Sequence, residues 1–406
     1  MKTAARPYPG EAASMSSVSE HEVIVVGAGP GGATAAAALA QAGRDVLLLD
    51  RQSFPRDKIC GDAVSLGAVQ IMNDLGMADQ VRAAQQRGEF YPLDGMRLVS
   101  PSGHTLHADF HRGPAGEESY VAPRLYFDAV IQQHAVESGA CYRRAEVAGP
   151  LLEDGRVVGV LARENGDNHA FRAPVVIGAD GVTSTIMRQL RPETNQHEDT
   201  HRAVALRAYI EGIELFPHKV EFFLYDEVLP GYAWIFPAGE DVANIGLGMR
   251  LDVFRKHKRN LKKMLSDFLD MPDIRPRLKN GRPPRDVAIW QLNFGSQEGL
   301  QHAFDGALLV GDAAGFINPL TGGGIHNALI SGMLAAQTVD EALRRGDVSR
   351  ESLRVYEERC NEAMWPGMRK AFFYQRFLLN YPTIVDWLIR LLGQHGSIAQ
   401  IFVSKL

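Results

Sequence analysis

The sequence predicts an α/β protein, α+β overall, in which a parallel-sheet domain is interrupted by an inserted antiparallel β-sheet domain and followed by a helical C-terminus. Three observations predict this fold. Apolar strands that run directly into glycine-rich turns begin near residues 23, 175 and 307, as expected for a parallel sheet buried on both faces. Strand-like segments that predict an antiparallel sheet lie between them, at about 195–285, and residues 346–406 have a helical composition.

The segment "VIVVGAGPGGATAAAALAQAGRDVLLLDR" (23–51) carries the pattern of a Rossmann-like dinucleotide-binding unit. An apolar strand comes first, an Ala-rich helix follows whose small side chains can lie close to a sheet, and a second apolar strand ends in an acid. The turn between the first strand and the helix holds the glycines of a GxGxxG motif, Gly27, Gly29 and Gly32.

Each residue type in this motif has a physical role. Gly27 permits the tight turn, Gly29 lets the backbone approach a pyrophosphate, and the N-terminus of the helix presents unpaired N–H groups to that anion. Asp50, about 20 residues on, is placed to accept a ribose hydroxyl, and the neighbouring Arg51 is a further predicted cofactor contact. The motif by itself does not distinguish NAD from FAD.

Length and composition indicate an ordinary globular protein. With 406 residues, 45% of them hydrophobic, the chain can bury a large core and form two or three domains. A net charge of −5 gives no reason to expect a nucleic-acid partner. The three cysteines, Cys60, Cys141 and Cys360, form neither a CxxC pair nor a disulfide framework, so we predict no metal site and a reducing, cytoplasmic compartment.

Neither end of the chain predicts a signal peptide or a membrane span. Residues 1–20 contain Pro, Gly and Ser but no long apolar run, so we expect a disordered leader. Near the C-terminus, "AFFYQRFLLNYPTIVDWLIRLLGQ" (371–394) is rich in aromatic residues and Leu; packing over the rest of the protein and peripheral contact with a membrane surface both fit it. The terminal Ser404-Lys405-Leu406 matches a peroxisomal signal, which we interpret as a coincidence.

Two later segments repeat the change from apolar strand to glycine-rich turn. "APVVIGADGVTSTIMR" (173–188) reaches Asp180, and "GALLVGDAAGFINPLTGGGIHNAL" (306–329) reaches Gly311 and Asp312. In this order and at these distances, the three motifs resemble the FAD-dependent oxidoreductases of the hydroxylase-like, glutathione-reductase-related flavoprotein superfamily. The resemblance favours FAD as the cofactor.

The superfamily resemblance also implies roles for particular residues. It implies that Asp312 holds the ribityl chain of FAD, that Asp180 lies near the pyrophosphate, and that Arg124, in an Arg-x-x-x-Asp helix, contacts the cofactor. A helix that begins after Gly323 and Gly324 would direct its positive end toward the flavin and stabilise negative charge there.

Two further stretches narrow the resemblance. "FPRDKICGD" (54–62) and "LPGYAWIFPAGEDVANIGLGM" (229–249), together with "NPLTGGGI", resemble the geranylgeranyl reductases and related polyprenyl reductases, whose pattern includes a Cys-Gly pair and a Tyr-x-Trp-x-Phe-Pro run. The resemblance covers roughly residues 21–345. It implies that Cys60 lies near the isoalloxazine and the substrate.

The Tyr-x-Trp-x-Phe-Pro run also has a physical interpretation. Strand-like alternation places Tyr232, Trp234 and Phe236 on one face, where they form an aromatic wall for a flexible isoprenoid, with Pro237 as a further pocket residue. We therefore predict Cys60, Tyr232 and Trp234 as the residues nearest to catalysis.

The resemblance implies reduction of isoprenoid carbon–carbon double bonds by hydride from reduced FAD. Two alternatives stay open: an FAD-dependent monooxygenase or halogenase, although halogenases carry a Trp-x-Trp-x-Ile run and position 232 is Tyr, and a noncatalytic flavin-binding protein. The sequence holds no second GxGxxG motif after a strand, so the predicted electron donor is transiently docked NAD(P)H or a reduced ferredoxin.

The motif positions predict a discontinuous domain organisation. The predicted units are an FAD-binding domain (21–90, 120–190 and 285–345), a substrate-binding domain (91–119 and 191–284) and a C-terminal helical region (346–406).

Overall fold

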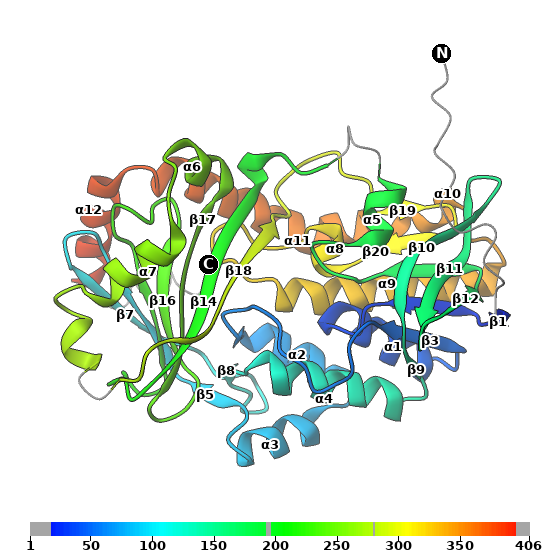
Figure 1. Cartoon of the computed structure of the whole chain (residues 1–406), viewed down its shortest axis with the longest axis horizontal. Helices are drawn as coiled ribbons and strands as arrows, with labels where there is room; N and C mark the ends of the chain where they lie inside the picture. Colours follow the sequence, from blue (N-terminus) through cyan, green and yellow to red (C-terminus); the bar gives the residue numbers. More distant parts are fainter. Residues whose placement is uncertain (1–17, 192–195, 279–280, 395–406) are drawn as a thin grey trace.

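The computed structural model describes residues 18–191, 196–278 and 281–394. It consists of two lobes (Figure 1). One lobe is built on a parallel sheet covered by helices, and the other on a seven-stranded sheet at the opposite end of the molecule. Most of the predicted leader, residues 1–17, and the end of the chain, residues 395–406 with the Ser404-Lys405-Leu406 sequence, lie outside the described residues.

The parallel sheet contains the strands predicted from the glycine-rich motifs. Its strand order is β19-β20-β13-β2-β3-β9, and every neighbouring pair is parallel except β19 with β20. The two central strands, β13 and β2, are fully buried apolar runs, as the sequence predicted. The strands are β2 (Val23–Val26), β3 (Val46–Asp50), β9 (Cys141–Arg144), β13 (Val175–Gly178), β19 (Ala303–Phe304) and β20 (Ala307–Leu309).

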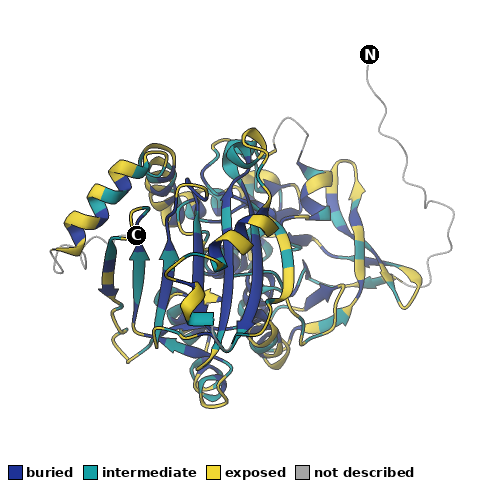
Figure 2. Ribbon diagram, turned by 60° about the vertical axis from the view of Figure 1, so that its left-hand side comes forward, coloured by how far each residue is buried: buried dark blue, intermediate teal, exposed yellow. Residues whose placement is uncertain are grey.

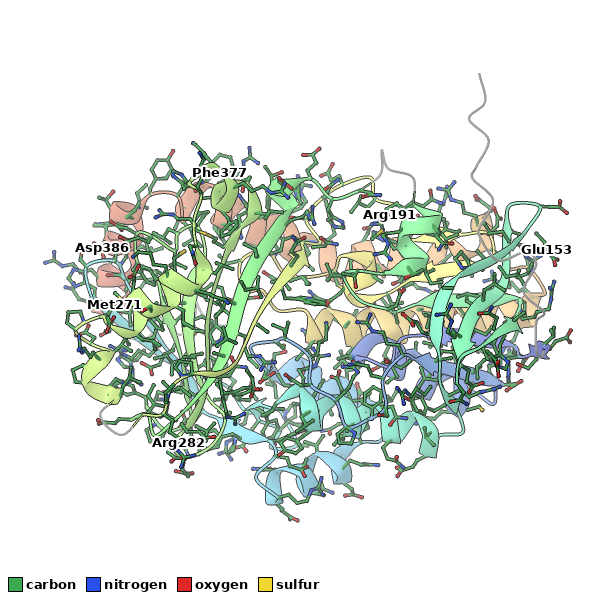
Figure 3. The ribbon with its side chains drawn as sticks, in the orientation of Figure 1. Glu153, Arg191, Met271, Arg282, Phe377 and Asp386 are labelled. Carbon is green, nitrogen blue, oxygen red and sulfur yellow. The ribbon has the colours of Figure 1, made fainter. Side chains whose placement is uncertain are left out.

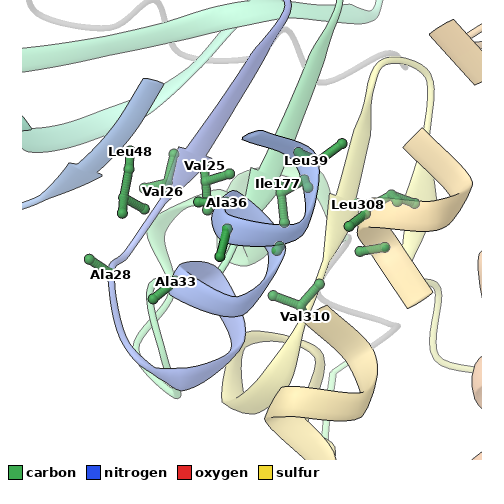
Figure 4. Close-up of a cluster of buried hydrophobic side chains, with 14 of the residues drawn as sticks. Val25, Val26, Ala28, Ala33, Ala36, Leu39, Leu48, Ile177, Leu308 and Val310 are labelled. Carbon is green, nitrogen blue, oxygen red and sulfur yellow. The ribbon is translucent and has the colours of Figure 1, made fainter. Parts of the chain in front are cut away.

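Small side chains let the helices of this lobe pack closely. Helix α1 (Pro30–Gln41) packs against α9 (Ile325–Arg345) and α4 (Arg124–Glu137). A Cβ on Gly332 of α9 would come within 2.4 Å of the Gly31 carbonyl oxygen, so the helices touch through their backbones. Figure 4 shows the alanines of α1 among the apolar side chains of the sheet.

Two smaller sheets complete this lobe. One has the order β1-β12-β11-β10 and the other β4-β8-β5. Strand β1 corrects the predicted leader, because residues 18–20 pair in parallel with β12. The strands are β1 (Val18–Glu20), β10 (Glu146–Glu153), β11 (Arg156–Glu164) and β12 (Asp167–Arg172), then β4 (Ala63–Val64), β5 (Tyr91–Leu93) and β8 (Ser119–Val121).

The seven-stranded sheet has the order β18-β14-β17-β16-β15-β6-β7 and is antiparallel except between β15 and β6. The domain boundary predicted at residue 285 is wrong by one strand, because β18 pairs with β14 of this sheet and not with the parallel sheet. The strands are β6 (Gly95–Val99), β7 (Thr105–Asp109), β14 (Arg202–Glu211), β15 (Lys219–Phe223), β16 (Tyr232–Pro237), β17 (Val242–Arg250) and β18 (Arg285–Asn293).

The two faces of this sheet have different neighbours. Alternate residues such as Ala233 and Ile235 pack with Leu265 and Phe268 of α7 (Leu261–Leu269), which together with α6 (Leu251–Lys256) covers one face. Figure 2 shows the central strands of the sheet as buried. The other face, on which Trp234 lies, turns toward the parallel-sheet lobe and forms one wall of the cavity described below.

The C-terminal helices extend from one lobe to the other. Helix α12 (Pro382–Gly393) packs on β7 and buries Val385, Ile389 and Leu392 in a cluster with leucines of the seven-stranded sheet lobe. Asp386 holds the helix against this lobe through three hydrogen bonds. Its Oδ1 accepts from Ser102 N–H at 2.9 Å, and its carboxylate also accepts from the hydroxyls of Ser100 and Ser102. Figure 3 shows Asp386 and Phe377 at the same end of the molecule, away from Glu153 of β10.

The remaining helices are short apart from α11 and α12. None of the helices that the structure describes is both long and apolar enough to cross a membrane. Those not yet given bounds are α2 (Leu66–Asp74), α3 (Ala78–Gln86), α5 (Thr185–Leu190), η2 (Asp199–His201), η3 (Arg275–Leu278), α8 (Gly311–Ala314), α10 (Arg350–Leu353), α11 (Val355–Phe373) and the π-helical turn η4 (Tyr374–Leu378).

Candidate active site

A cavity of about 490 Å³ lies between the two lobes, at the carboxyl ends of the parallel strands and against the seven-stranded sheet. It gathers most of the residues that the sequence singled out, although they come from distant segments. The predicted residues that line it are Gly27, Gly29, Asp50, Arg51, Cys60, Arg124, Asp180, Tyr232, Trp234, Phe236, Gly311, Asp312, Gly323 and Gly324. Gly32 and Pro237 do not line it.

The GxGxxG turn leaves room for a ligand at one glycine and uses the other two for packing. Gly27 has a φ of 101°, and a Cβ there would come within 2.4 Å of the Ala179 carbonyl oxygen. A Cβ on Gly32 would come within 1.8 Å of the Gly27 carbonyl oxygen, which explains why Gly32 is needed without lining the cavity. At Gly29 the nearest atom is Arg56 Nη2, at 3.7 Å, so its backbone is open toward the cavity.

Helix α1 presents an anion site at this turn. Its first turn has no side-chain cap, so its N–H groups are available to a ligand. Arg56 adds a cation: its Nη1 donates to Asp128 at 2.9 Å, its Nη2 lies 3.7 Å from Asp50, and its Nε has no partner among the described residues. We did not predict Arg56. The sequence signal that could have indicated it was a basic residue in the loop after Asp50, the acid that ends β3.

Backbone N–H groups fix the orientation of the Asp50 carboxylate. Its carboxylate accepts from Ala28 N–H at 2.9 Å and from Gln52 N–H at 2.9 Å. These bonds orient the carboxylate and leave lone pairs for the hydroxyls of a ribose. Arg51, by contrast, is an exposed residue at the rim.

Arg124 and Cys60 lie together in the middle of the cavity. Arg124 is buried and forms two parallel hydrogen bonds with Asp128, at 2.5 and 2.8 Å. Burial lowers the pKa of Arg124, but the pairing with Asp128 outweighs it and raises the pKa overall, so the guanidinium stays charged. Burial raises the pKa of Cys60, an effect that the charge of Arg124 opposes, so Cys60 is a protonated thiol at neutral pH.

Asp312 lies beside the N-terminus of α9. Its carboxylate accepts from Lys58 Nζ at 2.8 Å. Burial alone would raise the pKa of Asp312, but the charge of Lys58 outweighs it and lowers the pKa, so the carboxylate stays ionised. Gly324, the N-cap of α9, has no side-chain cap, and a Cβ there would lie 3.3 Å from Asp312 Oδ1. The carboxylate and the positive helix end therefore meet at the cavity wall, and the predicted interaction of this helix end with a flavin stays a prediction.

Asp180 lines the cavity and also stabilises the N-terminus of α5. It accepts from Thr185 N–H at 2.6 Å, from Ile186 N–H at 3.3 Å and from the Ser184 hydroxyl, so it caps α5. Its Cα would lie 3.0 Å from a Cβ on Gly27, which puts it directly beside the GxGxxG turn.

The aromatic residues of β16 form a continuous wall. The ring centroids of Tyr232 and Trp234 are 6.0 Å apart, and those of Trp234 and Phe236 are 6.1 Å apart. Trp234 lies flat across the neighbouring strand, because a Cβ on Gly246 of β17 would come within 2.3 Å of its ring. We did not predict Gly246, although a glycine inside a strand is the usual signal of such a close approach.

A buried polar network behind the wall joins the two lobes. Trp234 Nε1–H donates to Asn244 Oδ1 at 2.9 Å, and Asn244 Nδ2–H donates to Asp62 at 2.7 Å and to the Cys60 carbonyl at 2.8 Å. Tyr209 also donates to Asp62. Burial raises the pKa of Asp62 to about 6, with both hydrogen bonds opposing it. This network fixes the rotamer of Trp234 and the position of the Cys60 loop.

The cavity fits a dinucleotide that carries a flavin. It contains an uncapped helix N-terminus with an open glycine for a pyrophosphate, an acid for a ribose, and a second acid beside a second uncapped helix. These features define the class of the protein as an FAD-binding flavoprotein, and a family model described as "FAD binding domain" matches residues 20–371.

Comparison with known proteins defines the family more closely. The chain is 34% identical over 369 residues to the digeranylgeranylglycerophospholipid reductase of Methanosarcina acetivorans, covering 89% of this chain and 85% of that protein. It is 31% identical over 393 residues to digeranylgeranylglycerophospholipid reductase 1 of Methanothermobacter thermautotrophicus, covering 95% and 91%. This chain therefore belongs to the geranylgeranyl reductase family of FAD-dependent oxidoreductases, as its motifs predicted.

Solved structures agree with this membership. A geranylgeranyl bacteriochlorophyll reductase-like protein from Thermoplasma acidophilum superposes with a TM-score of 0.80 at 27% identity, covering 95% of this chain and 92% of that one. A flavin-dependent brominase has a TM-score of 0.75 at 22% identity, covering 95% and 99%. The second likeness shows the shared fold alone. The predicted fold class is confirmed.

Proposed function

We propose that this protein reduces carbon–carbon double bonds of a geranylgeranyl or polyprenyl chain. The observation that carries the proposal is that the aromatic wall of β16 and the predicted cofactor residues line one cavity. The names of the two archaeal relatives, both reductases of a digeranylgeranyl lipid, support an isoprenoid substrate.

The residues of the cavity suit this reaction. When bound, FAD supplies the hydride, and each saturated double bond also takes up one proton. An unactivated alkene offers no polar group to hold, so orientation and exclusion of water carry the catalysis, which is what a wall of Tyr232, Trp234 and Phe236 provides. Burial raises the pKa of both the Cys60 thiol and the Tyr232 hydroxyl, so Sγ and Oη each hold a proton at the cavity surface.

Mass spectrometry of products tests the reaction. FAD-loaded protein is incubated with geranylgeranyl diphosphate and a chemical reductant without oxygen, and in parallel with NADPH in air. We expect products that gain pairs of hydrogen atoms without any need for oxygen. Products that gain an oxygen or halogen atom would refute the proposal. A protein whose flavin becomes reduced but that forms no product would also refute it.

One pair of variants distinguishes a role of the aromatic wall in turnover from a role in stabilising the fold. Trp234→Ala should lower turnover of the isoprenoid while FAD stays bound. Trp365→Ala is the matched control, because Trp365 is a partly buried tryptophan that does not line the cavity. Equal loss in both variants would mean that Trp234 acts only through the fold.

The electron donor is the second part of the proposal. Each catalytic cycle oxidises reduced FAD, so two electrons must return from NAD(P)H or from a reduced ferredoxin, the donors that the sequence predicted. Anaerobic bleaching of the FAD absorbance by NADPH would identify the nucleotide. Bleaching only by reduced ferredoxin would identify a protein donor.

We also propose that the C-terminal helices contact a membrane surface, from which a lipid substrate would enter. Six large apolar side chains of α11, η4, α12 and the turn that precedes α12 are exposed, with Trp387 at 63%, and the basic residues Arg376 and Arg390 lie among them. Helix α12 is thus apolar on its inner and its outer face. The exposed side chains are Phe373, Phe377, Tyr381, Ile384, Trp387 and Leu391.

Co-sedimentation with lipid vesicles tests this contact. We expect the full chain to bind vesicles of phosphatidylcholine with phosphatidylglycerol, and the double variant Phe377→Gln/Trp387→Gln to bind more than about tenfold more weakly. The matched control, Val287→Gln/Ile289→Gln, removes two exposed apolar side chains of β18. Equal binding of vesicles by both variants would refute the contact. A wild type that self-associates and does not bind vesicles would refute it as well.

A further inference from the structure

Two residues of the cavity wall carry three buried donor atoms that have no partner among the described residues. Arg207 of β14 is 1% exposed; its Nη2 donates to Asp57 at 2.6 Å and to the Lys58 carbonyl at 3.4 Å, whereas its Nε and Nη1 donate to nothing. Trp290 of β18 has a buried Nε1 that is likewise unpaired. Both residues line the cavity.

The register of the sheet brings these donors together. Arg207 is opposite Ala288, and Ala205 is opposite Trp290, so Arg207 and Trp290 are diagonal neighbours on one face of β14 and its outer neighbour β18 (Figure 1). On the other side of β14, the residue opposite Arg207 is Gly246. No side chain of β17 therefore covers the guanidinium at this point.

The unpaired atoms are all donors, so the missing ligand must be an acceptor. An arginine Nε carries one hydrogen and Nη1 carries two, and an indole Nε1 donates only. Burial lowers the pKa of Arg207, but its hydrogen bond to Asp57 and the charges nearby outweigh this and raise it, so the guanidinium stays charged. Leaving such donors buried without an acceptor is costly. The bidentate pair of Arg124 with Asp128 shows how this cavity otherwise satisfies an arginine.

We propose that Arg207 and Trp290 bind the phosphate group of the isoprenoid substrate. The proposal rests on the proposed function and adds that the substrate carries a phosphate or diphosphate at its polar end. Guanidinium and indole N–H groups are suited to phosphate oxygens, the guanidinium because its fork of donors matches them. The donors of this site are side chains of β14 and β18, a different set from the N-terminus of α1 and Arg56 at the predicted pyrophosphate site, although Arg207 reaches the loop of Arg56 through its hydrogen bond to Asp57.

The distance across the sheet sets the orientation of the substrate. Arg207, Gly246 and Trp234 are paired in one row over β14, β17 and β16, so two strand spacings, about 10 Å, separate the backbone of Arg207 from that of the aromatic wall. Tyr232 belongs both to the aromatic wall and to the leucine cluster beneath α12. A substrate held by its phosphate at Arg207 would thus lay its first isoprene units across the wall and point its far end toward α12.

Kinetics with two matched substrates test the site. Geranylgeranyl diphosphate and geranylgeraniol differ only in the phosphate group, and the variants are Arg207→Gln and Trp290→Phe, the second of which removes one N–H and keeps an aromatic ring. We expect the KM for the diphosphate to rise about 10- to 100-fold in Arg207→Gln and about 3- to 10-fold in Trp290→Phe. The KM for the alcohol and the FAD content should stay unchanged. Equal effects on both substrates, or loss of FAD, would overturn the assignment.

Direct binding keeps the test independent of turnover. Inorganic pyrophosphate is titrated into the FAD-loaded protein by calorimetry; we expect binding to the wild type, weaker binding to both variants, and unchanged binding to Arg250→Gln. Arg250 is the matched control, because it is buried with an unpaired Nη1 but does not line the cavity. No binding to the wild type would overturn the site. A wild type that binds pyrophosphate but reduces neither substrate would instead overturn the proposed reaction alone.

Discussion

Asp62 is a buried carboxyl group whose titration should be visible in the stability of the whole protein. It is fully buried, and it accepts hydrogen bonds from Tyr209 and Asn244. Burial raises its pKa from 3.8 to about 6, while those hydrogen bonds and the charges of Arg207 and Arg124 act in the opposite direction. The native state therefore binds this proton more tightly than the unfolded state does.

The size and sign of the effect follow from these two pKa values. The stability contributed by the protonated form is complete below about pH 4 and is lost as the pH rises through about 6. The difference between 3.8 and about 6 corresponds to about 3 kcal/mol. Asp62→Asn keeps an acceptor oxygen for both donors and tolerates the φ of 64° at this position, but it carries no charge at any pH. Asp62→Asn should therefore be more stable than the wild type by up to about 3 kcal/mol near pH 8, with the advantage vanishing near pH 4.

Denaturant unfolding of both FAD-loaded proteins, repeated from about pH 5 to pH 8, measures this difference. All other groups titrate alike in the two proteins, so the pH dependence of the difference isolates Asp62. Asp154→Asn is the control, because Asp154 also has a positive φ, 49°, but is exposed, and it should follow the wild type at every pH. A difference that does not change with pH, or a variant that loses stability above pH 6, would show that the arginines compensate the carboxylate fully.

Three further outcomes are expected at the cavity. Asp312→Ala removes the acid at the N-terminus of α9, so less than about a tenth of the purified protein should hold FAD, as measured by the flavin absorbance. Gly246→Ala would place a Cβ within 2.2 Å of the Leu206 carbonyl oxygen and 2.3 Å of the Trp234 ring, so β14 and the ring must both shift; turnover of the isoprenoid should fall by at least about tenfold while the FAD content is kept. Because burial raises the pKa of Cys60, a thiol reagent at pH 7.5 should label it at least about tenfold more slowly than the exposed Cys141, as followed by peptide mass spectrometry. Retained flavin, unchanged turnover or equal labelling would contradict the respective expectation.

The cofactor half of the site could be predicted because its information is local. The strand, the glycines, the helix and the acid of the first motif are contiguous from residue 23 to 50, and each residue type is dictated by backbone geometry that a single βαβ unit fixes. The Gly311-Asp312 and Gly323-Gly324 pairs are similar, since each follows a strand or begins a helix. Arg56 was missed because a basic residue in a loop carries no such geometric requirement.

The substrate half depends on strand register, which composition does not encode. Trp234 lies over Gly246 only because β16 and β17 pair in one register, and a slip of one residue would turn every side chain to the other face. Asp62 meets Tyr209 and Asn244 across 147 and 182 residues of sequence. The boundary at residue 285 was wrong for the same reason, because β18 follows the antiparallel segments in the chain and its pairing with β14 cannot be read from its composition.

Asn244 shows why the two halves must be considered together. Its amide holds Trp234 of the aromatic wall, and the same amide holds the carbonyl of Cys60 and the carboxyl of Asp62 in the loop from the other lobe. One amide therefore fixes the Trp234 ring and the loop that carries Cys60 relative to each other. Since the same loop presents Lys58 to Asp312 and Asp57 to Arg207, it is the one segment that contacts the aromatic wall, the predicted cofactor site and the proposed phosphate site together.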